Sequence, residues 1–410
     1  KGFKYYLGWQ HIICWTDENI GLKRIWMNVY DTEVEESTTQ GVWDNNDNIA
    51  WELDNLNGIA AYIDDDQMFG GWDEGGGFIG EVRFYFGNNT QPKDPWMIRQ
   101  MTISDEMPQN LKGLTPQYPM FMTCVVSAKG AQSGAYIGKQ STVPEMWFEV
   151  VNYPKALGND TDFAAKIGED ANPAEVIYAI LTNKDWGCNY DITEDIIDLD
   201  SLKKMGKILE EEELGISCLL TNINQANEYI SKILDHVNGV KYDDPLTGKL
   251  TFKLIRNDYD ADDIKTFDTT NCDDMDFTRV DWSETSSGIS LTFTYADDKY
   301  NQAELNIKDL ANVKLKGTYT EKTVDGEYFT TSKNALVMAQ TKLLSAAYPL
   351  STITFKTSRY GYDLTIGDPI MVSWKPYGID KQVYRITDLD YATLTSGAIT
   401  VTAMEDMFGL

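Results

Sequence analysis

The sequence has little histidine and no closely spaced cysteines. It contains 2 histidines, His11 and His236, and neither stands in an HExxH pattern or beside a cysteine. No CxxC pair occurs among the 5 cysteines, so the sequence indicates neither a zinc site nor a disulfide framework. We expect the cysteines to be free thiols. We expect His236 to lie near the C-terminus of a helix, where it would interact favourably with the helix dipole. The cysteines are Cys14, Cys124, Cys188, Cys218 and Cys272.

Basic side chains are also scarce. The 410 residues include 35 Lys and Arg against 64 Asp and Glu, which gives a formal net charge of −29. A protein that grips nucleic acid needs a clustered basic surface, so this charge argues against such a role and against an anionic membrane surface. No run of about 18 apolar residues offers a transmembrane helix. We expect no stable membrane insertion.

Motifs of catalysis and of phosphate binding are missing or incomplete. Neither a GxSxG nor a P-loop pattern occurs, and we predict no catalytic residue. Gly75, Gly77 and Gly80 spell GxGxxG, but the dinucleotide motif needs a strand before it and a helix after it. Alternation in residues 81–86 instead predicts a strand after the glycines. We therefore expect a glycine-rich hairpin loop and no cofactor.

Runs of aspartate resemble metal loops only in part. Asp258, Asp260 and Asp262 mimic the opening of a calcium loop, but Asp263 and Thr269 replace its glycine and its bidentate glutamate. Residues 64–66 are three consecutive aspartates, typical of a solvated turn. We predict no metal site. Calcium binding at residues 258–262 is the less favoured alternative.

Aromatic residues are plentiful. They form 12% of the chain, with 23 Tyr and 11 Trp, which favours strands and buried interfaces. Trp43, Trp51 and Trp72 lie among acidic and amide residues, where they could stack on sugars or pack at an interface. We favour the core or an interface, because bulky aromatic side chains are more often buried than used as platforms.

The first part of the chain, residues 1–155, is predicted to be β-rich. Val82, Phe84 and Phe86 alternate with Glu81, Arg83 and Tyr85, the period of a strand with one buried face. Residues 3–15 also have a strand-like pattern. The chain opens at Lys1 without a methionine, and we expect further residues upstream.

Residues 156–255 are predicted to form a mixed α/β module. Asn172 caps a helix, with Pro173 at its first position and Glu175 completing a capping box. Further helices are expected from about residue 200 and over residues 224–237, the latter ending at Asn238-Gly239. Strand-like residues 215–220 precede the last helix, and residues 240–255 follow it as a hairpin. Residues 215–255 are thus predicted to form a compact unit of a strand, a helix and a hairpin.

Residues 256–410 are predicted to return to β structure, with one helix over residues 332–347. This helix is expected to bury Leu336, Ala339, Leu343 and Ala346. A strand is expected at residues 289–295, and four more at residues 351–359, 369–374, 382–388 and 398–403, with glycine between them. A tube-like barrel is the natural arrangement of these four. The fold class is therefore α+β, mainly β, with several β-barrel or sandwich-like domains.

Six short blocks of sequence together resemble the tail hub, or central tail tip, proteins of tailed bacteriophages. The most specific is Asn172 to Ile177, followed by Leu181-Thr182-Asn183 and Asp185-Trp186-Gly187. The other blocks occur in the same order along the chain. They are Tyr5-Tyr6-Leu7-Gly8, residues 75–80 leading into Phe84-Tyr85, Tyr348-Pro349-Leu350, Gly367-Asp368-Pro369 and residues 405–410. Many long tip proteins carry fibronectin-like or fibre extensions that are not among these 410 residues, so we do not expect these residues to bind a receptor directly.

The resemblance implies a structural protein of the virion rather than an enzyme. It implies a homotrimeric ring that closes the distal end of the tail tube, organises the tip or baseplate and takes part in genome ejection. The implied partners are the distal tail protein, the tail tube, the tape measure protein and other tip or fibre proteins, with genomic DNA only in transit. Assembly would occur in the cytoplasm of the host bacterium. Acidic residues on the lumen wall would let DNA slide past without adhering.

Two other functions stay open. The first is a virion-associated hydrolase of cell wall or polysaccharide, which needs two facing carboxylates or a metal in a cleft. The second is a carbohydrate-binding host adhesin, in which exposed tryptophans such as Trp43 or Trp72 bind glycans.

Overall fold

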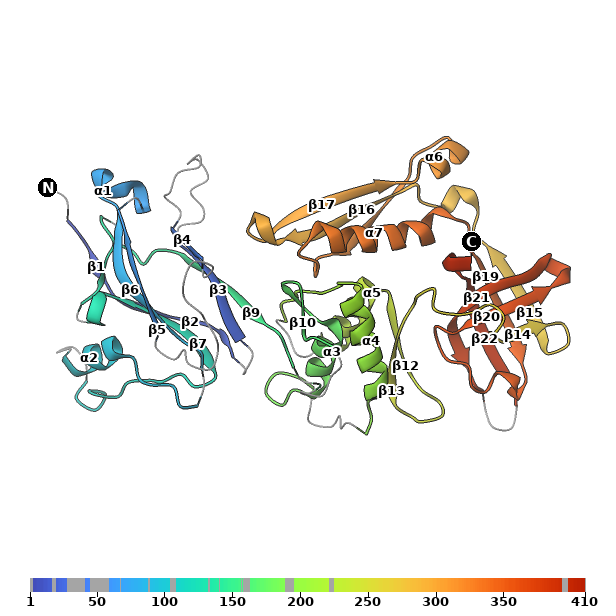
Figure 1. Ribbon diagram of the computed structural model, residues 1–410, viewed down its shortest axis with the longest axis horizontal. Coiled ribbons are helices and arrows are strands. Elements are labelled where there is room, and N and C mark those ends of the chain that lie inside the picture. Colours follow the sequence, from blue (N-terminus) through green and yellow to red (C-terminus); the bar gives the residue numbers. More distant parts are fainter. Residues whose placement is uncertain are drawn as a thin grey trace. The chain divides into compact units, whose positions relative to one another are not determined.

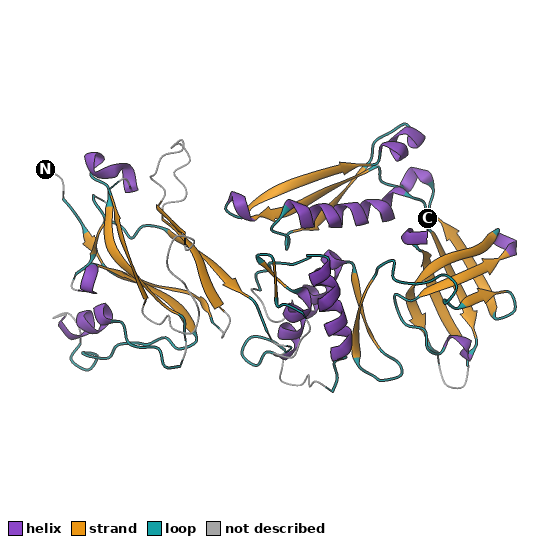
Figure 2. Cartoon of the chain, viewed as in Figure 1, coloured by secondary structure: helices purple, strands orange, loops and turns teal. Residues whose placement is uncertain are grey.

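The computed structural model describes residues 3–16, 20–27, 41–44, 59–66, 68–87, 89–103, 108–131, 133–139, 141–155, 157, 163–188, 195–220, 225–392 and 397–409. Two compact units divide the chain, Lys1–Asn152 and Tyr153–Leu410. Strands dominate both, and helices are concentrated in the second (Figures 1 and 2). The expected fold class, α+β and mainly β, is confirmed. The division at residues 155 and 255 stays a prediction.

The first unit is built from two antiparallel sheets. The larger has the order β1-β8-β6-β7-β2, with β5 paired to β6, and the smaller has the order β4-β3-β9. Ile20 and Leu22 of the smaller sheet share one apolar core with Val82, Phe84 and Val126 of the larger, so the sheets pack face to face. The strands are β1 (Tyr6–Leu7), β2 (Trp9–Trp15), β3 (Ile20–Met27), β4 (Gly41–Asp44), β5 (Ile59–Asp65), β6 (Phe78–Tyr85), β7 (Phe121–Ser127), β8 (Ala135–Tyr136) and β9 (Met146–Asn152).

Strand β6 is buried on both of its faces, which the sequence did not predict. Val82 and Phe84 face the core as expected, but Arg83 and Tyr85 are also buried. The expectation of one solvated face is therefore wrong for β6. The cause lies in Asp94, directly before helix α2 (Pro95–Ile103), because it accepts hydrogen bonds from both polar side chains. Short helix α1 (Gly71–Glu74) precedes β6.

Helix α3 (Pro173–Thr182) begins where the sequence predicts. Asn172 caps it by accepting a hydrogen bond from the amide of Ala174 at 3.1 Å, and Pro173 fills the first turn. The prediction that Glu175 completes a capping box is wrong, however. The Glu175 carboxylate accepts from the amide of Leu157 at 2.9 Å, because α3 is buried along almost its whole length and this side chain points into the module. A small pair of strands, β10 (Lys166–Ile167) and β11 (Asp170–Ala171), precedes α3.

Two amphipathic helices and a hairpin complete the expected mixed module. Helix α4 (Leu199–Glu211) buries Leu202, Met205 and Leu209, and helix α5 (Ala226–Val237) ends at Asn238 in the left-handed conformation. The hairpin pairs β12 (Gly239–Asp243) with β13 (Leu250–Leu254). Residues 215–220 are not a strand. They form only one bridge, between Ile216 and Ala171, because no neighbouring strand extends far enough to pair with the rest.

A three-stranded sheet packs against this module and shares its core. Its order is β17-β16-β18, with β16 (Gly288–Tyr295) antiparallel to β17 (Asn301–Lys308) and parallel to β18 (Glu321–Gly326). Helix α7 (Ser332–Ala347) lies along the sheet (Figure 1) and buries Met338 and Ala339 against it. Leu336 was expected in this core, but it lies on the exposed side of α7. Helix α6 (Leu310–Lys316) joins β17 to β18.

The last element is a curved six-stranded sheet with a separate core. Its order is β14-β20-β21-β22-β19-β15, and every pair is antiparallel except β14 with β20. The four strands expected from the sequence are β19, β20, β21 and β22, and alternate residues of each face the core. The strands are β14 (Thr266–Asp268), β15 (Cys272–Arg279), β19 (Ser351–Thr357), β20 (Pro369–Trp374), β21 (Ile379–Asp390) and β22 (Ile399–Glu405).

Candidate functional surface

The glycine-rich loop that imitates a dinucleotide motif is a turn between α1 and β6. A strand follows the glycines, as expected, and Gly80 already belongs to it. Gly75 and Gly77 have φ of 83° and 92°, a backbone region that other residues rarely adopt. The Gly75 carbonyl accepts from the amide of Lys139 at 2.8 Å, so the loop is pinned to the segment after β8. Its role is to shape the surface on this side of the larger sheet.

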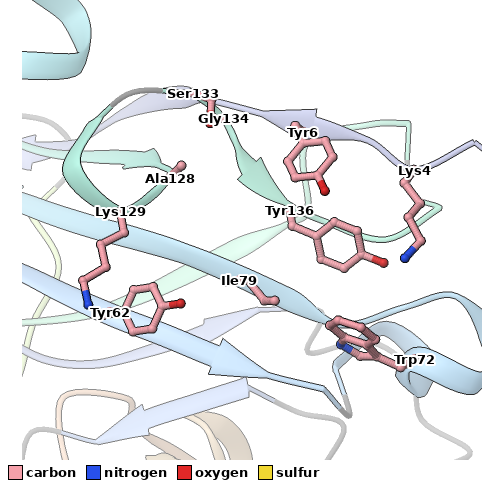
Figure 3. A pocket seen from close by; sticks show the side chains of 10 residues that line it. All are labelled: Lys4, Tyr6, Tyr62, Trp72, Ile79, Ala128, Lys129, Ser133, Gly134 and Tyr136. Atoms are coloured by element: carbon pink, nitrogen blue, oxygen red, sulfur yellow. The ribbon is translucent and has the colours of Figure 1, made fainter.

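That surface is hollowed and lined with aromatic rings (Figure 3). The hollow has a volume of about 310 Å³. Tyr6, Tyr62 and Trp72 expose 62%, 46% and 49% of their surface, and buried Tyr136 lies between Tyr6 and Trp72. The remaining lining residues are Lys4, Ile79, Ala128, Lys129, Ser133 and Gly134.

Two lysines lie at opposite ends of the hollow (Figure 3). The Lys4 ammonium lies 5.3 Å from the ring centre of Trp72 and the same distance from that of Tyr136. The Lys129 ammonium lies 4.7 Å from the ring centre of Tyr62. These distances are those of cation–π contacts, which hold each ammonium over a ring without neutralising its charge. The hollow is therefore aromatic and cationic.

A buried ion pair stabilises the same sheet, farther along β6. Arg83 Nε donates to Asp94 Oδ2 at 2.7 Å, and Nη2 donates to Asp94 Oδ1 at 3.3 Å. Tyr85 also donates to Asp94 Oδ2, at 2.7 Å. Burial acts to raise the pKa of Asp94, but the hydrogen bonds from Arg83 and Tyr85 outweigh it and hold the pKa below its ordinary value. Arg83 also contacts Glu81, which accepts from the amide of Gly130 at 2.8 Å, beside Lys129.

A second buried polar cluster lies at the end of the C-terminal sheet. Glu405 accepts from the amide and hydroxyl of Ser351, at 2.9 Å and 2.7 Å, and pairs with Arg279 at 3.2 Å. Asp406 pairs with Arg385 at 3.0 Å and accepts from the Tyr259 hydroxyl at 2.8 Å. Both carboxylates are thus engaged in holding strands and loops together. No local sequence pattern predicts this cluster, because Tyr259 and Arg279 lie more than a hundred residues before the two carboxylates.

The aspartate runs show the features of turns. Asp260 accepts from the amide of Asp262 at 3.0 Å, and Asp258, Asp260 and Asp262 are exposed. Asp64 and Asp66 are exposed as well, at the end of β5. Within the described ranges, no group of three or more His, Cys, Asp or Glu residues could hold a metal ion. The five cysteines, all of which lie among the described residues, form no disulfide with one another.

Both histidines are packed within the protein. His236 Nδ1 lies 2.8 Å from the Lys232 carbonyl, to which it must donate, and Nε2 accepts from the Tyr328 amide at 3.2 Å. The ring is therefore neutral, and burial lowers its pKa. Although His236 lies in the last turn of α5, the expected benefit from the helix dipole is wrong for a neutral ring. Burial lowers the pKa of His11 too.

Of the three tryptophans singled out from the sequence, Trp72 belongs to the aromatic hollow. Trp51 lies outside the described residues, as does the side chain of Trp43. The sequence did not predict that Tyr6, Tyr62 and Tyr136 would join Trp72.

No helix in the described ranges is both long enough and apolar enough to cross a membrane.

Comparison with known proteins shows that the chain is similar to proteins of phage tails and virus-like particles. Residues 225–389 match the family described as "Putative phage tail protein". A solved chain in the virion of a native gene transfer agent particle is similar with a TM-score of 0.59 and 15% identity, over 98% of this chain and 78% of that chain. This likeness shows a shared fold along almost the whole sequence. None of the curated proteins matches it.

Two tail proteins encoded by prophages are similar at a lower level. The 43 kDa tail protein of prophage MuSo2 from Shewanella oneidensis has a TM-score of 0.34 and 11% identity, over 95% of this chain and 99% of that chain. A prophage tail protein from Listeria monocytogenes EGD-e has a TM-score of 0.34 and 13% identity, over 86% and 89%. The resemblance to phage tail proteins expected from the sequence is confirmed by the family match to residues 225–389.

Proposed function

We propose that this phage tail protein is the hub of the tail tip, a structural ring that closes the distal end of the tail tube. The observation that carries the proposal is the fold shared with a chain of a virion particle over 98% of the sequence. The same similarity supports a structural rather than an enzymatic role. Its partners would be the distal tail protein, the tail tube, the tape measure protein and other tip or fibre proteins. The tail tip would assemble in the cytoplasm of the host bacterium, before the virion is released.

Exposed apolar side chains in the second unit support contact between copies. Leu310 and Leu315 of α6 expose 75% and 72% of their surface. Val280 and Trp282 are also exposed. Their segment lies next to α6, since Lys316 of α6 donates to the Ser283 carbonyl at 3.4 Å. Exposed apolar side chains that lie together typically mark protein interfaces. We assign this α6 patch, defined by Val280, Trp282, Leu310 and Leu315, to the contact between neighbouring subunits.

The three-stranded sheet of the same unit supports closure into a ring. Within the described residues, β17 and β18 are its two edges, with no strand paired beyond either. An unpaired strand edge presents backbone donors and acceptors that a second chain can satisfy. Since the two edges differ, pairing β17 of one copy with β18 of the next is a head-to-tail contact, which generates a ring when the rotation between copies closes. We propose a ring of three copies.

The strong negative charge suits a passage for DNA. With 64 acidic residues against 35 basic ones, a lumen wall bearing part of this excess repels phosphates and lets the genome pass during ejection. A hydrolase gains no comparable support. Glu405 and Asp406, neighbouring buried carboxylates, are both committed to structural hydrogen bonds.

The test is the mass and the shape of the purified protein. Light scattering should give three times the mass of one chain, and electron microscopy should show rings with a central opening. Leu315→Asp should shift the mass toward the monomer, whereas Leu246→Asp, at an exposed leucine of the hairpin turn, should not. A protein that stays monomeric at every concentration, or that degrades purified cell wall, would refute the hub.

A further inference from the structure

We propose that the aromatic hollow of the first unit binds an anionic saccharide, with a sugar ring stacked on Trp72 and its acidic group held by Lys4 or Lys129. This is a binding function beyond the structural role of a hub, and it does not depend on that role. The hollow lies within residues 1–152, and every residue of the argument belongs to that unit.

Stacking surfaces are the first requirement, and the hollow supplies them. Tyr6 and Trp72 lie on either side of Tyr136, with ring centres 5.5 Å and 5.7 Å from it. Both outer rings are about half exposed or more, while Tyr136 is 6% exposed and forms the floor between them. Sugar rings present apolar C–H faces, which pack on such aromatic rings, and hydroxyls, which suit tyrosine hydroxyls and ammonium groups. The cluster is a platform rather than part of the core.

Charge is the second requirement. The ten lining residues include two lysines and no carboxylate, on a chain whose net charge is −29. The two ammonium groups contact aromatic rings and form no ion pair with the described residues, so their charge is available to a ligand. A local cationic hollow on an acidic protein favours an anionic ligand over a neutral one.

Rigidity is the third requirement, because a platform that is already ordered loses less entropy on binding. Backbone hydrogen bonds tie the segment of Lys4 and Tyr6 to that of Tyr136: the Tyr5 amide donates to the Gly138 carbonyl at 2.9 Å, and the Ile137 amide donates to the Tyr5 carbonyl at 3.1 Å. At the other end, Glu81 holds the turn beside Lys129. The rings are therefore presented by a fixed scaffold.

An acidic peptide is the chief competing occupant, and the lining disfavours it. Peptide recognition uses pockets for aliphatic side chains or backbone pairing along a strand edge. Here the lining side chains are mainly aromatic rings and ammonium groups, with Ile79 and Ala128 as the only aliphatic ones among the ten. The volume of about 310 Å³ lies at the lower end of the range typical of small-ligand sites.

Calorimetry with the full chain tests the proposal. The probes are trigalacturonate and glucose 1-phosphate, which separate a sugar carboxylate from a sugar phosphate, with maltotriose, inorganic phosphate and hexaglutamate for comparison. At least one anionic saccharide should bind at least tenfold more tightly than maltotriose and inorganic phosphate. Trp72→Ala should weaken this binding at least tenfold, and Lys4→Ala with Lys129→Ala should remove the preference for the anionic probe.

Matched variants elsewhere in the chain guard against indirect effects. Trp15→Ala removes another partly exposed tryptophan of the first unit, and Lys112→Ala removes an exposed lysine of that unit; both lie outside the hollow. Neither should change saccharide affinity, and circular dichroism should show all variants folded. Absence of binding by every saccharide, equal binding by Trp72→Ala, or binding by hexaglutamate alone would overturn the proposal.

Discussion

The indole of Trp72 lies so close to Gly77 that a Cβ atom built on this glycine would stand 2.3 Å from the indole Nε1. No side chain fits in that space while the ring keeps its place. A glycine is therefore required at position 77 for two reasons: its φ is 92°, and the indole of Trp72 occupies the space that a Cβ would need.

Gly77→Ala should accordingly displace Trp72 from the hollow. A residue with a Cβ at positive φ destabilises the fold by more than about 1 kcal/mol, and the steric clash adds to this. The variant should also bind the anionic saccharide more weakly. Gly113→Ala is the matched control, since Gly113 has φ of 80° but no neighbour within 4 Å of a built Cβ. Equal losses of unfolding free energy in the two variants would contradict the assigned contact.

Removing one partner of the Arg83–Asp94 pair should strongly destabilise the first unit. Asp94→Ala leaves the Arg83 guanidinium buried without its carboxylate, a change that typically costs about 3–5 kcal/mol. Asp363→Ala removes a carboxylate from an exposed pair with Lys265 and should cost about 0–1 kcal/mol. Urea denaturation measures both, and equal effects would show that the buried pair is unimportant.

The same pair predicts how stability depends on pH in acid. The folded protein holds the pKa of Asp94 below its ordinary value, so the unfolded chain binds the proton first. The contribution of Asp94 is present above the ordinary pKa of aspartate and is lost as pH falls through the lowered folded value. Asp94→Asn should flatten the stability profile in this window. An unchanged acid profile would argue against the assigned shift.

His236 predicts a second pH effect, closer to neutrality. Burial lowers its pKa in the folded protein, so folding disfavours the protonated ring. Its contribution to stability should be present above the ordinary histidine pKa of about 6.5 and fall progressively at lower pH. Protonated Nε2 could no longer accept from the Tyr328 amide. His236→Gln should lower stability at pH 8 and reduce its dependence on pH between about 6.5 and the lowered folded value, as measured by denaturation at several pH values.

Asn172 should matter more than an ordinary helix cap. Besides capping α3, its Nδ2 donates to the carbonyls of Gly206 and Ala164, at 3.0 Å and 3.2 Å. Asn172→Ala should lose the cap, worth about 0.5–2 kcal/mol, and the two hydrogen bonds that Nδ2 donates, worth about 0.5–1.5 kcal/mol each. Thr331→Ala removes only the exposed cap of α7 and should cost less. Equal unfolding free energies of the two variants would contradict this.

Local signals in the sequence predicted the elements that local chemistry determines. The pair Asn172-Pro173 located α3, and Asn238-Gly239 located the end of α5, because capping depends on neighbouring residues. The strand predicted at residues 215–220 does not form, because residues with β propensity need a neighbouring strand to pair with. The burial of Arg83 depends on Asp94, eleven residues later and beyond a loop, which periodicity does not register.

The aromatic hollow could not be predicted for the same reason. Tyr6, Tyr62, Trp72 and Tyr136 come from four separate segments. They come together because β1 pairs with β8, β8 with β6, and β6 with β5. The sequence offered only Trp72 as one candidate. The phage tail resemblance was predictable because it rested on the order of short blocks.

The position of β22 in the C-terminal sheet constrains how this part of the chain is made. It lies between β21 and β19, so it joins a half formed by β14, β20 and β21 to a half formed by β19 and β15. Of the six strands, β22 is the last to be synthesised. During translation the two halves emerge with their central partner still inside the ribosome. The sheet therefore folds only after synthesis has passed residue 405, and until then its unpaired edges need protection from other nascent chains.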